Sequence, residues 1–424
     1  MPLPKFQTLK GFKDVLPEET PYWRFVLDKA LELADRYGYQ QIDTPILEET
    51  RLFLRGLQEG TAIILDKELY SFEDLDGTHI SLRPEFTAGI MRAYVQHGMH
   101  TRPKPVKLFA IGPLFRHEKP QAGRFRQHTQ FNVELLGEED PAADLEIMQL
   151  AYNLYKELGF QGVSFQINSI GCPVCRPPYI EKLVDYFEAH VDELPEVDKR
   201  RLKVNPLRVL DTKEEATLAL LADAPKSVDH LCHDCAEHFE ALQGYLQALD
   251  MPYQVNFRLV RGFDYYVRTV FEVWAEELGA QNALCGGGRY DGLVESVGGP
   301  KTPGVGVGIG IERIVLSLKA QGIQPPALPR PMVMALHRGP EAKLAALKLT
   351  DALRAAGVPA SLAFGDRSLK SQLKSANKAG ARYAAIIAED ELDKGVATLR
   401  DMESGEQVEV ALDQVVGWVE KQLG

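Results

Sequence analysis

The chain has 424 residues, of which 45% are hydrophobic and 25% are charged, and this length predicts two or three soluble domains. No apolar run approaches the roughly 20 residues of a membrane span, and the first residues lack the apolar segment of a signal peptide. We therefore expect a cytoplasmic protein without a membrane partner. The net charge of −12 still permits a nucleic-acid partner, because phosphate contacts need only a local basic surface.

The N-terminal segment predicts a helix followed by an interrupted strand. Apolar residues recur at helical spacing over residues 18–37, and Gly38 ends the pattern. The next segment, YQQIDTPILEE, contains Pro45, which cannot donate a hydrogen bond within a sheet. This segment is either an ordinary edge strand or a contact between subunits.

Residues 69–97 predict a hairpin that leads into a helix. The turn is expected at Asp76-Gly77, and the helix is expected to begin near Pro84. Glu85 and Thr87 then lie at the junction of strand and helix. A carboxylate at a helix N-terminus is favoured for structural reasons alone, so Glu85 becomes a candidate site residue only through its neighbours.

Two segments far apart in the chain show the alternation of a strand with one polar face. The first follows Arg116 and Arg124, and its polar face comprises Arg126, His128, Gln130, Asn132 and Glu134. The second follows Arg261, and its polar face comprises Asp264, Tyr266, Arg268, Val270 and Glu272. Together they predict one antiparallel sheet with a polar, ligand-binding face. The arginines favour an anionic ligand such as a nucleotide, whereas a solvated, charged strand face is the alternative.

Glycines dominate residues 281–313. Three of them precede Arg289-Tyr290-Asp291, and four alternate with Val and Ile over Gly304–Gly310, so one face of that strand has no side chains and could hold a flat ring. A helix is expected from about Glu312, with Arg313 in its first turn. The segment contains neither the dinucleotide-binding glycine pattern nor a Walker A lysine.

Two Cys-x-x-Cys pairs lie in a mainly helical segment. These pairs are Cys172/Cys175 and Cys232/Cys235, and four thiolates can form a closed tetrahedral zinc site. More than fifty residues separate the pairs, which is longer than in common zinc ribbons. Reduced, buried cysteines without a metal are the alternative.

A proline-rich linker over residues 321–330 precedes a segment in which strands and helices alternate. That alternation predicts a small α/β domain with a mostly parallel sheet. Lys370, Lys374 and Lys378 recur at steps of four on one helix. This basic stripe is either a solvated helix face or a contact to a phosphate backbone.

The motifs together resemble the class II histidyl-tRNA synthetases from end to end. TPILEE, the strand pair with Arg116 and GVGVGIGIER are similar to the three class II motifs, of which the first builds a dimer interface. RGFDYYVRTVFE and CGGGRYDG are similar to the two signature motifs of the histidine enzymes. The resemblance implies an α+β class II core with an antiparallel sheet flanked by helices over residues 1–320. It also implies a helical insertion at about 170–250 and an α/β anticodon-binding domain at 331–424.

The resemblance further implies a homodimer that ligates L-histidine to tRNA(His). ATP, with Mg²⁺ on its outer phosphates, forms a histidyl-adenylate and pyrophosphate, and the transfer to tRNA releases AMP. Arg116 and Arg261 would hold the α-phosphate as catalytic residues, Arg313 would contact the adenine and the γ-phosphate, and Glu118 and Arg124 would be further ATP contacts. The residues implied for histidine binding are Glu85, Thr87, Gln130, Glu134, Tyr266 and Tyr290.

The chemistry of this last set fits its implied role. A neutral imidazole has one donor and one acceptor nitrogen, so Glu134 can accept from one and Tyr266 can donate to the other. A carboxylate also suits the α-ammonium group. A site that pairs both ring nitrogens should reject non-polar rivals by a factor on the order of 10⁴.

Two other functions compete with this interpretation. A regulatory paralogue of ATP phosphoribosyltransferase would share the sheet and bind histidine without catalysis. Such paralogues typically lack the C-terminal domain and the ATP arginines, whereas this chain retains Arg116, Arg261 and Arg313. A zinc-dependent binding protein would explain only the cysteines. The source organism, the tRNA identity nucleotides, the anticodon contacts and the conformation of the insertion are not determined by the sequence.

Overall fold

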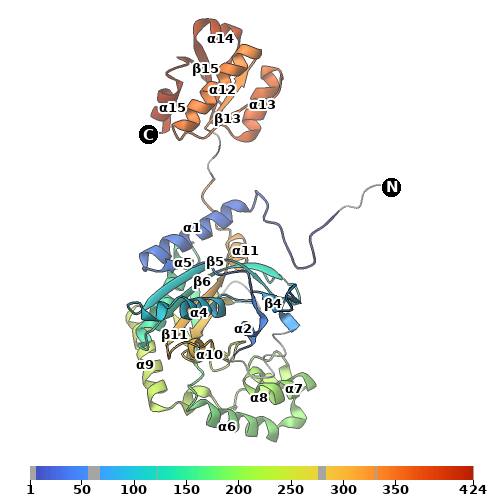
Figure 1. Cartoon of the computed structure of the whole chain (residues 1–424), viewed down its shortest axis with the longest axis vertical. Helices are drawn as coiled ribbons and strands as arrows, with labels where there is room; N and C mark the ends of the chain where they lie inside the picture. Colours follow the sequence, from blue (N-terminus) through green and yellow to red (C-terminus); the bar gives the residue numbers. More distant parts are fainter. Residues whose placement is uncertain are drawn as a thin grey trace, which may run out of the picture. The chain divides into compact units, whose positions relative to one another are not determined.

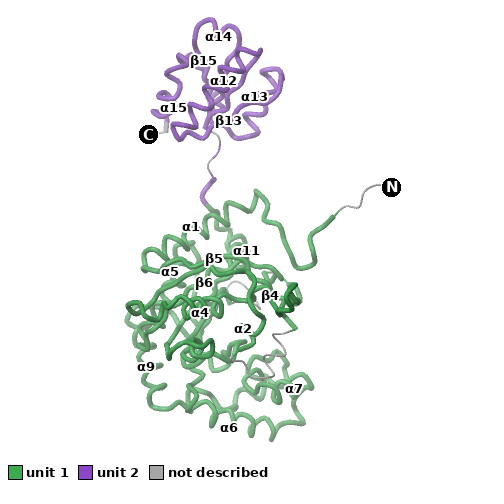
Figure 2. Tube along the Cα trace, in the orientation of Figure 1, with its two compact units in different colours: residues 1–325 green, residues 326–424 purple. Residues whose placement is uncertain are grey.

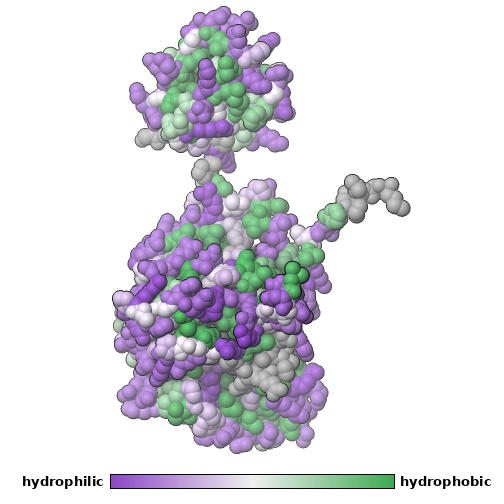
Figure 3. Space-filling view, viewed as in Figure 1, coloured by the Kyte–Doolittle hydropathy of each residue, from purple (hydrophilic) through white to green (hydrophobic). Residues whose placement is uncertain are grey.

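The computed structural model describes residues 6–55, 67–121, 123–275, 283–328, 330 and 332–423. The chain divides into two units, residues 1–325 and 326–424, and this boundary falls within the proline-rich segment (Figure 2). Hydrophilic residues cover much of the visible surface of each unit (Figure 3). Within the described ranges, no helix combines the length and apolarity that a membrane span requires.

An eight-stranded sheet forms the centre of the first unit (Figure 1). Its strands, in spatial order, are β1 (Gln40–Gln41), β5 (Val106–Phe115), β6 (Gln127–Leu136), β11 (Gly304–Gly310), β10 (Ala283–Arg289), β9 (Val267–Ala275), β7 (Val163–Ser169) and β8 (Tyr253–Val255). Neighbouring strands are antiparallel except at the two edges, where β1 pairs with β5 and β7 with β8 in parallel. The predicted antiparallel sheet is confirmed, and the two glycine-rich strands lie between the two polar-faced ones.

Four helices cover one face of this sheet. They are α1 (Thr20–Arg36), α5 (Pro141–Glu157), α9 (His233–Ala248) and α11 (Ile311–Ala320). The apolar half of each alternating strand points toward them, with Phe131 on β6, Phe271 on β9 and Val307 on β11 in one buried cluster. The strict alternation of β6 thus leaves its polar side chains on the opposite face.

Smaller elements stand over the polar face. A three-stranded sheet contains β2 (Leu47–Glu49), β4 (His79–Leu82) and β3 (Ser71–Glu73), with α2 (Thr50–Leu54), α4 (Thr87–Gln96) and α10 (Leu293–Ser296) nearby. Pro45 divides the strand predicted after α1, since β1 and β2 belong to different sheets and each lies at an edge. Helix α4 begins at Thr87, later than the predicted start near Pro84.

The alternation predicted from Asp264 onward is wrong at its beginning. Strand β9 begins at Val267, and Arg268 adopts a left-handed conformation with a φ of 51°. The pairing with β10 shifts there, because Val270 faces Gly288 whereas Val267 faces Arg289. A β-bulge of this kind redirects side chains next to a site, and here it precedes the polar face that carries Glu272.

The insertion between β7 and β8 contains α6 (Arg176–Ala189), α7 (Glu196–Val204) and α8 (Glu215–Leu220) in addition to α9. Its own hydrophobic cluster extends over residues 179–224 and includes Tyr179, Leu183 and Phe187. Helix α9 instead packs on the central sheet, through Phe239, Leu242 and Leu246 among others. Within the segment predicted at about 170–250, the residues with a separate core are therefore those of 179–224.

The second unit has a five-stranded sheet with helices around it. The strand order is β13 (Ala360–Leu362), β12 (Val333–His337), β14 (Tyr383–Ile387), β15 (Val396–Asp401) and β16 (Gln407–Ala411). The helices are α12 (Pro340–Ala355), α13 (Leu369–Ala379), α14 (Glu389–Lys394) and α15 (Val415–Leu423). The first three strands are parallel, as predicted, and the last two add an antiparallel pair.

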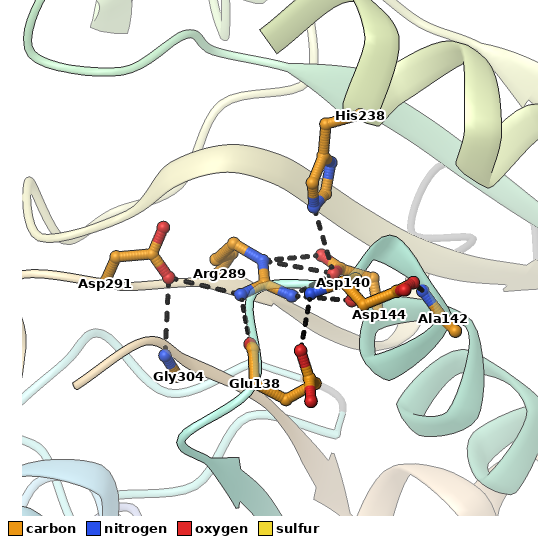
Figure 4. A network of polar contacts seen from close by, with 8 residues as sticks. All are labelled: Glu138, Asp140, Ala142, Asp144, His238, Arg289, Asp291 and Gly304. Atoms are coloured by element: carbon orange, nitrogen blue, oxygen red, sulfur yellow. Dashed lines mark hydrogen bonds and ion pairs between the residues drawn. The ribbon is translucent and has the colours of Figure 1, made fainter. Parts of the chain in front are cut away.

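A buried polar network connects the end of β10 to α5 and α9 (Figure 4). Arg289 and Asp144 both have fully buried side chains, and Arg289 Nε donates to Asp144 Oδ2 at 3.1 Å. The Arg289 guanidinium also donates to the carbonyl oxygens of Glu138 at 2.8 Å and Asp140 at 3.3 Å. His238 Nε2 lies 3.5 Å from Asp144 Oδ2. Although burial opposes ionisation, the pKa of Asp144 is lowered because Arg289 lies beside it.

Replacing Asp144 with alanine should destabilise the first unit strongly. The substitution removes the fully buried carboxylate from the Arg289 charge and leaves the partly exposed Asp291 at 3.3 Å beside it. Removing one partner of a buried ion pair typically costs about 3–5 kcal/mol. Urea denaturation should show this loss, whereas Glu32→Ala, which removes an exposed pair with Lys29, should cost less than about 1 kcal/mol. Equal effects of the two substitutions would contradict a role for the buried pair.

Candidate active site

A cavity of about 230 Å³ opens on the polar face of the central sheet. Its lining comes from segments far apart in the sequence: the loop between β5 and β6, the segment before β9, the strands β6, β9, β10 and β11, and the start of α11. The predicted ATP residues that line it are Arg116, Glu118, Arg124, Arg261 and Arg313, and Gln130 of the predicted histidine set lines it as well. The fold thus brings together all of the residues that the resemblance implied for ATP.

Carboxylates lie beside the guanidinium groups of Arg116, Arg124 and Arg261 in this cavity. Glu118 lies between Arg124, whose Nε is 2.9 Å from Glu118 Oε2, and Arg116, at 3.8 Å from Glu118 Oε1. Arg261 Nη1 donates to Glu272 Oε1 at 3.1 Å. Burial, and next the charge of Arg124, lower the pKa of Arg313. Arginines crowded in this way would be stabilised by a polyanion such as a triphosphate.

The glycines of β10 and β11 provide room for these side chains. A Cβ at Gly286 would collide with the Arg261 guanidinium, one at Gly306 with the Glu134 carboxylate, and one at Gly308 with the Gln130 amide. The expectation that the bare face of β11 could hold a flat ring therefore needs correction at Gly306, where a protein carboxylate fills the space. Gly308 and Gly310 still line the cavity.

A buried cluster of carboxylates and tyrosines adjoins the arginine cavity. Glu134 is fully buried and accepts hydrogen bonds from Thr87 Oγ1 at 2.6 Å and from the Tyr290 hydroxyl. Glu85 Oε1 accepts from the Ala88 backbone N–H at 2.8 Å, and Glu85 Oε2 has no hydrogen-bond partner among the described residues. Tyr266 lies against Tyr290 at a centroid distance of 6.4 Å.

The raised pKa values of the carboxyl groups in this cluster favour a cationic or N–H-donating ligand beside them. Burial raises the pKa of Glu134 to about 8, and the nearby Glu85 carboxylate contributes to the rise. Burial also raises the pKa of Glu85. Two buried carboxyl groups with raised pKa values gain stability as anions when a positive or donor group arrives. Arg261 connects the arginine cavity to this cluster, since its guanidinium carbon lies 5.6 Å from the centre of the Tyr266 ring.

Three cavity residues carried no assigned role in the sequence: His128, Glu272 and Glu312. Burial, and then the charges of Arg116 and Arg124, lower the pKa of His128 to about 3, so its imidazole is neutral. Glu272 accepts from Trp274 Nε1 at 2.9 Å as well as from Arg261. His128 and Glu272 both lie on the polar faces of the alternating strands, and this position is the signal that could have identified them.

The four cysteines of the two Cys-x-x-Cys pairs converge at the two ends of the insertion. Their sulfur atoms all lie within 4.8 Å of one another, with Cys172 Sγ at 3.8 Å from Cys232 Sγ. Both pairs are free thiols in the structure. Four converging sulfurs fit the donor set and the size of a tetrahedral zinc site.

Two protein-family models match the chain. A family model described as histidyl-tRNA synthetase matches residues 11–173 and 182–314, and one described as an anticodon binding domain matches residues 332–422. The chain belongs to the histidyl-tRNA synthetase family.

Relatives in this family match the chain over its length. A histidine–tRNA ligase of Dehalococcoides mccartyi is 47% identical over 418 residues, which is 99% of this chain and 100% of the relative. The structure of apo S. aureus histidyl-tRNA synthetase is 33% identical, with a TM-score of 0.83 over 98% of this chain and 100% of that one. A Bacillus halodurans structure titled ATP phosphoribosyltransferase regulatory subunit/histidyl-tRNA synthetase has a TM-score of 0.63 at 22% identity, covering 92% and 100%, so it shows the fold alone.

The pKa of Glu134 in this synthetase predicts a stability effect that depends on pH. Between the ordinary value of 4.5 and about 8, the folded carboxyl keeps a proton that the unfolded one has lost, so stability falls as pH rises. Glu134→Gln cannot ionise, so its stability relative to the natural chain should rise over this range, by at most about 1.4 kcal/mol per pH unit. Urea denaturation at pH 5.5 and 8 measures the effect.

The matched control is Glu240→Gln, which changes an exposed carboxylate on α9. This control should follow the pH dependence of the natural chain. A Glu134→Gln variant that did the same would show that the buried carboxyl is ionised throughout the range.

Proposed function

We propose that this chain ligates L-histidine to tRNA(His) in two steps through a histidyl-adenylate. The observation that supports this function most directly is that Arg261 and Tyr266 join the arginine-lined cavity to the buried cluster around Glu134. The cavity suits a polyphosphate, and the cluster suits a ligand with N–H donors and positive charge. The reaction between such ligands is attack of an amino-acid carboxylate on the α-phosphate of ATP, with pyrophosphate leaving.

Arg116 and Arg261 are the proposed α-phosphate contacts. Negative charge builds on the phosphate oxygens during in-line displacement, and fixed guanidinium groups stabilise that charge without reorganisation. Arg313 would lie near the adenine and the γ-phosphate, and Arg124 and Glu118 would make further ATP contacts. Members of this ATP-dependent family generally use Mg²⁺, which would bridge the outer phosphates and neutralise part of their charge.

The histidine pocket would recognise its substrate through both ring nitrogens and the ammonium group. Thr87 and Tyr290 each use one hydrogen bond to Glu134, and a carboxylate has further lone pairs for a substrate N–H. The Tyr266 hydroxyl would donate to the other ring nitrogen. Glu85 Oε2, which has no hydrogen-bond partner among the described residues, could accept from the ammonium group of the substrate. Gln130 lies between the arginine cavity, which it lines, and the cluster around Glu134.

The second unit would bind the anticodon part of the tRNA. Lys370, Lys374 and Lys378 on α13 are exposed, as a contact to a phosphate backbone requires. Arg382, which follows this helix, forms an ion pair with Asp401 at 2.7 Å. The insertion would contact the acceptor stem, and a homodimer would form through the segment that contains TPILEE.

A histidine-binding regulatory paralogue is less well supported. Such a protein has no use for four arginines around a phosphate-sized cavity. The match of residues 332–422 to an anticodon binding domain also favours a chain that handles tRNA.

Replacing Arg261 with alanine tests the catalytic role. Histidine-dependent exchange of pyrophosphate into ATP should fall by at least about a hundredfold, as for removal of a preorganised donor, while the Kd for ATP should rise much less. The control is Arg200→Ala, an exposed residue of the insertion. Unchanged exchange in Arg261→Ala would remove this residue from the chemistry, and exchange that depended on another amino acid would overturn the proposed substrate.

The four cysteines would hold one structural Zn²⁺ as thiolates. Metal analysis of the purified chain should find about one zinc per chain. Substituting Co²⁺ should produce the absorption of a thiolate-to-metal charge transfer, and Cys232→Ser should abolish it. If the chain is purified without chelators and contains no metal, these residues are reduced cysteines without a metal ion.

A further inference from the structure

The cysteine cluster lies directly beside the loop that carries Tyr266 into the histidine pocket. We propose that the metal held by the four cysteines positions this loop through Arg176, so that the metal supports histidine binding although it takes no part in the chemistry. This inference rests on the zinc site and the histidine pocket proposed above. It assigns a positioning role to Arg176, which no motif had singled out.

Arg176 connects the cysteines to the pocket loop. It follows Cys175 in the chain and is the first residue of α6. Its Nε donates to the carbonyl oxygen of Ile170 at 3.1 Å, and its Nη2 donates to that of Gly171 at 3.1 Å and to that of Tyr266. One side chain therefore connects the start of the first cysteine turn to the backbone of a predicted substrate residue.

A second connection runs through the backbone. The N–H of Arg268 donates to Gly171 O, and the N–H of Ile170 donates to Arg268 O, both at 2.9 Å. These bonds extend the pairing of β7 with β9 as far as the left-handed Arg268. Because Cys172 comes next in the chain, any displacement of the cysteine turn is transmitted to the bulge and to Tyr266 before it.

The cysteine turn already has the geometry of thiolate ligands. The N–H of Cys172 points at Cys175 Sγ at 3.2 Å, and the N–H of Val174 points at Cys172 Sγ at 3.4 Å. Gly171 has a φ of 72°, and a Cβ there would lie only 2.9 Å from Cys175 Sγ. The backbone thus approaches the sulfurs closely and directs donors at them, which stabilises sulfur as an anion.

The metal would fasten both ends of the insertion at once. Cys232 and Cys235 stand at the start of α9, which packs on the central sheet, so a bound ion would tie the start of α6 to that rigid helix. Four thiolates around Zn²⁺ carry two net negative charges, which stabilise the nearby Arg176 cation in its partly buried position. Without the metal, no bond connects the two cysteine pairs.

The effect should fall on histidine rather than on ATP. Tyr266 faces the histidine pocket, whereas Arg116, Arg124 and Arg313 lie on other segments. Loss of a hydrogen bond from a charged donor costs about 1.5–3 kcal/mol, which corresponds to a rise of roughly tenfold to a hundredfold in the KM for histidine. Arg261 lies on the same loop and over the Tyr266 ring, but its proposed role is in the chemical step more than in ATP binding. We therefore expect kcat to fall together with the rise in the KM for histidine, and the KM for ATP to stay within about twofold.

The experiment compares the full chain with three variants: Cys232→Ser, Arg176→Ala and the control Arg200→Ala. Zinc content is measured by mass spectrometry, and both KM values come from pyrophosphate exchange. Cys232→Ser should lose zinc and raise the KM for histidine alone. Arg176→Ala should keep its zinc and show the same selective rise, and Arg200→Ala should match the natural chain. If Cys232→Ser does not fold, chelator-treated natural chain replaces it, and added Zn²⁺ should restore the KM.

The contrary results are distinct from one another. A normal KM for histidine after metal loss, or in Arg176→Ala, overturns the positioning role. A parallel rise in both KM values also overturns it, since that indicates general damage. A natural chain that is active without zinc refutes the metal site and this inference together. A zinc-loaded natural chain with no histidine-dependent exchange refutes the proposed function.

Discussion

The candidate site depends on the burial of one ionisable group, the carboxyl group of Glu134. It lies in the middle of the central sheet, fully removed from solvent, and is held by hydroxyl donors from α4 and from the end of β10. Burying a charge without a counter-ion is costly, and its raised pKa expresses that cost. A protein keeps such a group where a ligand supplies the missing positive charge or donor. The same carboxyl group that lowers the stability of the fold without a ligand would therefore strengthen the binding of a substrate.

The surrounding structure makes this arrangement possible. The glycines of β10 and β11 leave space for Glu134, Gln130 and Arg261 to lie flat on the sheet. Arg289, one residue before Tyr290, is locked to Asp144 and to backbone carbonyls of the segment before α5. That network holds the end of β10 in place, and with it the tyrosine that donates to Glu134. Backbone space and buried ion pairing thus act together to place a few polar atoms.

The insertion is attached to the sheet beside the loop that carries Tyr266. Its own core is separate, yet both of its ends return to the cysteine cluster beside Tyr266. The insertion, which is proposed to contact tRNA, is therefore connected through backbone hydrogen bonds and through Arg176 to the loop that carries Tyr266. Such proximity gives a physical route by which the position of the insertion would affect the proposed binding of histidine.

The sequence by itself determined the family, the polar-faced strands and nearly all of the candidate site residues. Period-two alternation shows which side chains of β6 share a face, and the glycine and arginine motifs identify the class of enzyme. It did not show the break at Arg268, the filling of the Gly306 position by Glu134, or the burial of Arg289 against Asp144. These features depend on which strands and helices are neighbours, and periodicity within one segment carries no information about contacts between segments far apart. Convergence of the four cysteines was a hypothesis from spacing alone, and only the tertiary structure placed their sulfurs together, because the packing of α9 on the sheet brings the two ends of the insertion side by side.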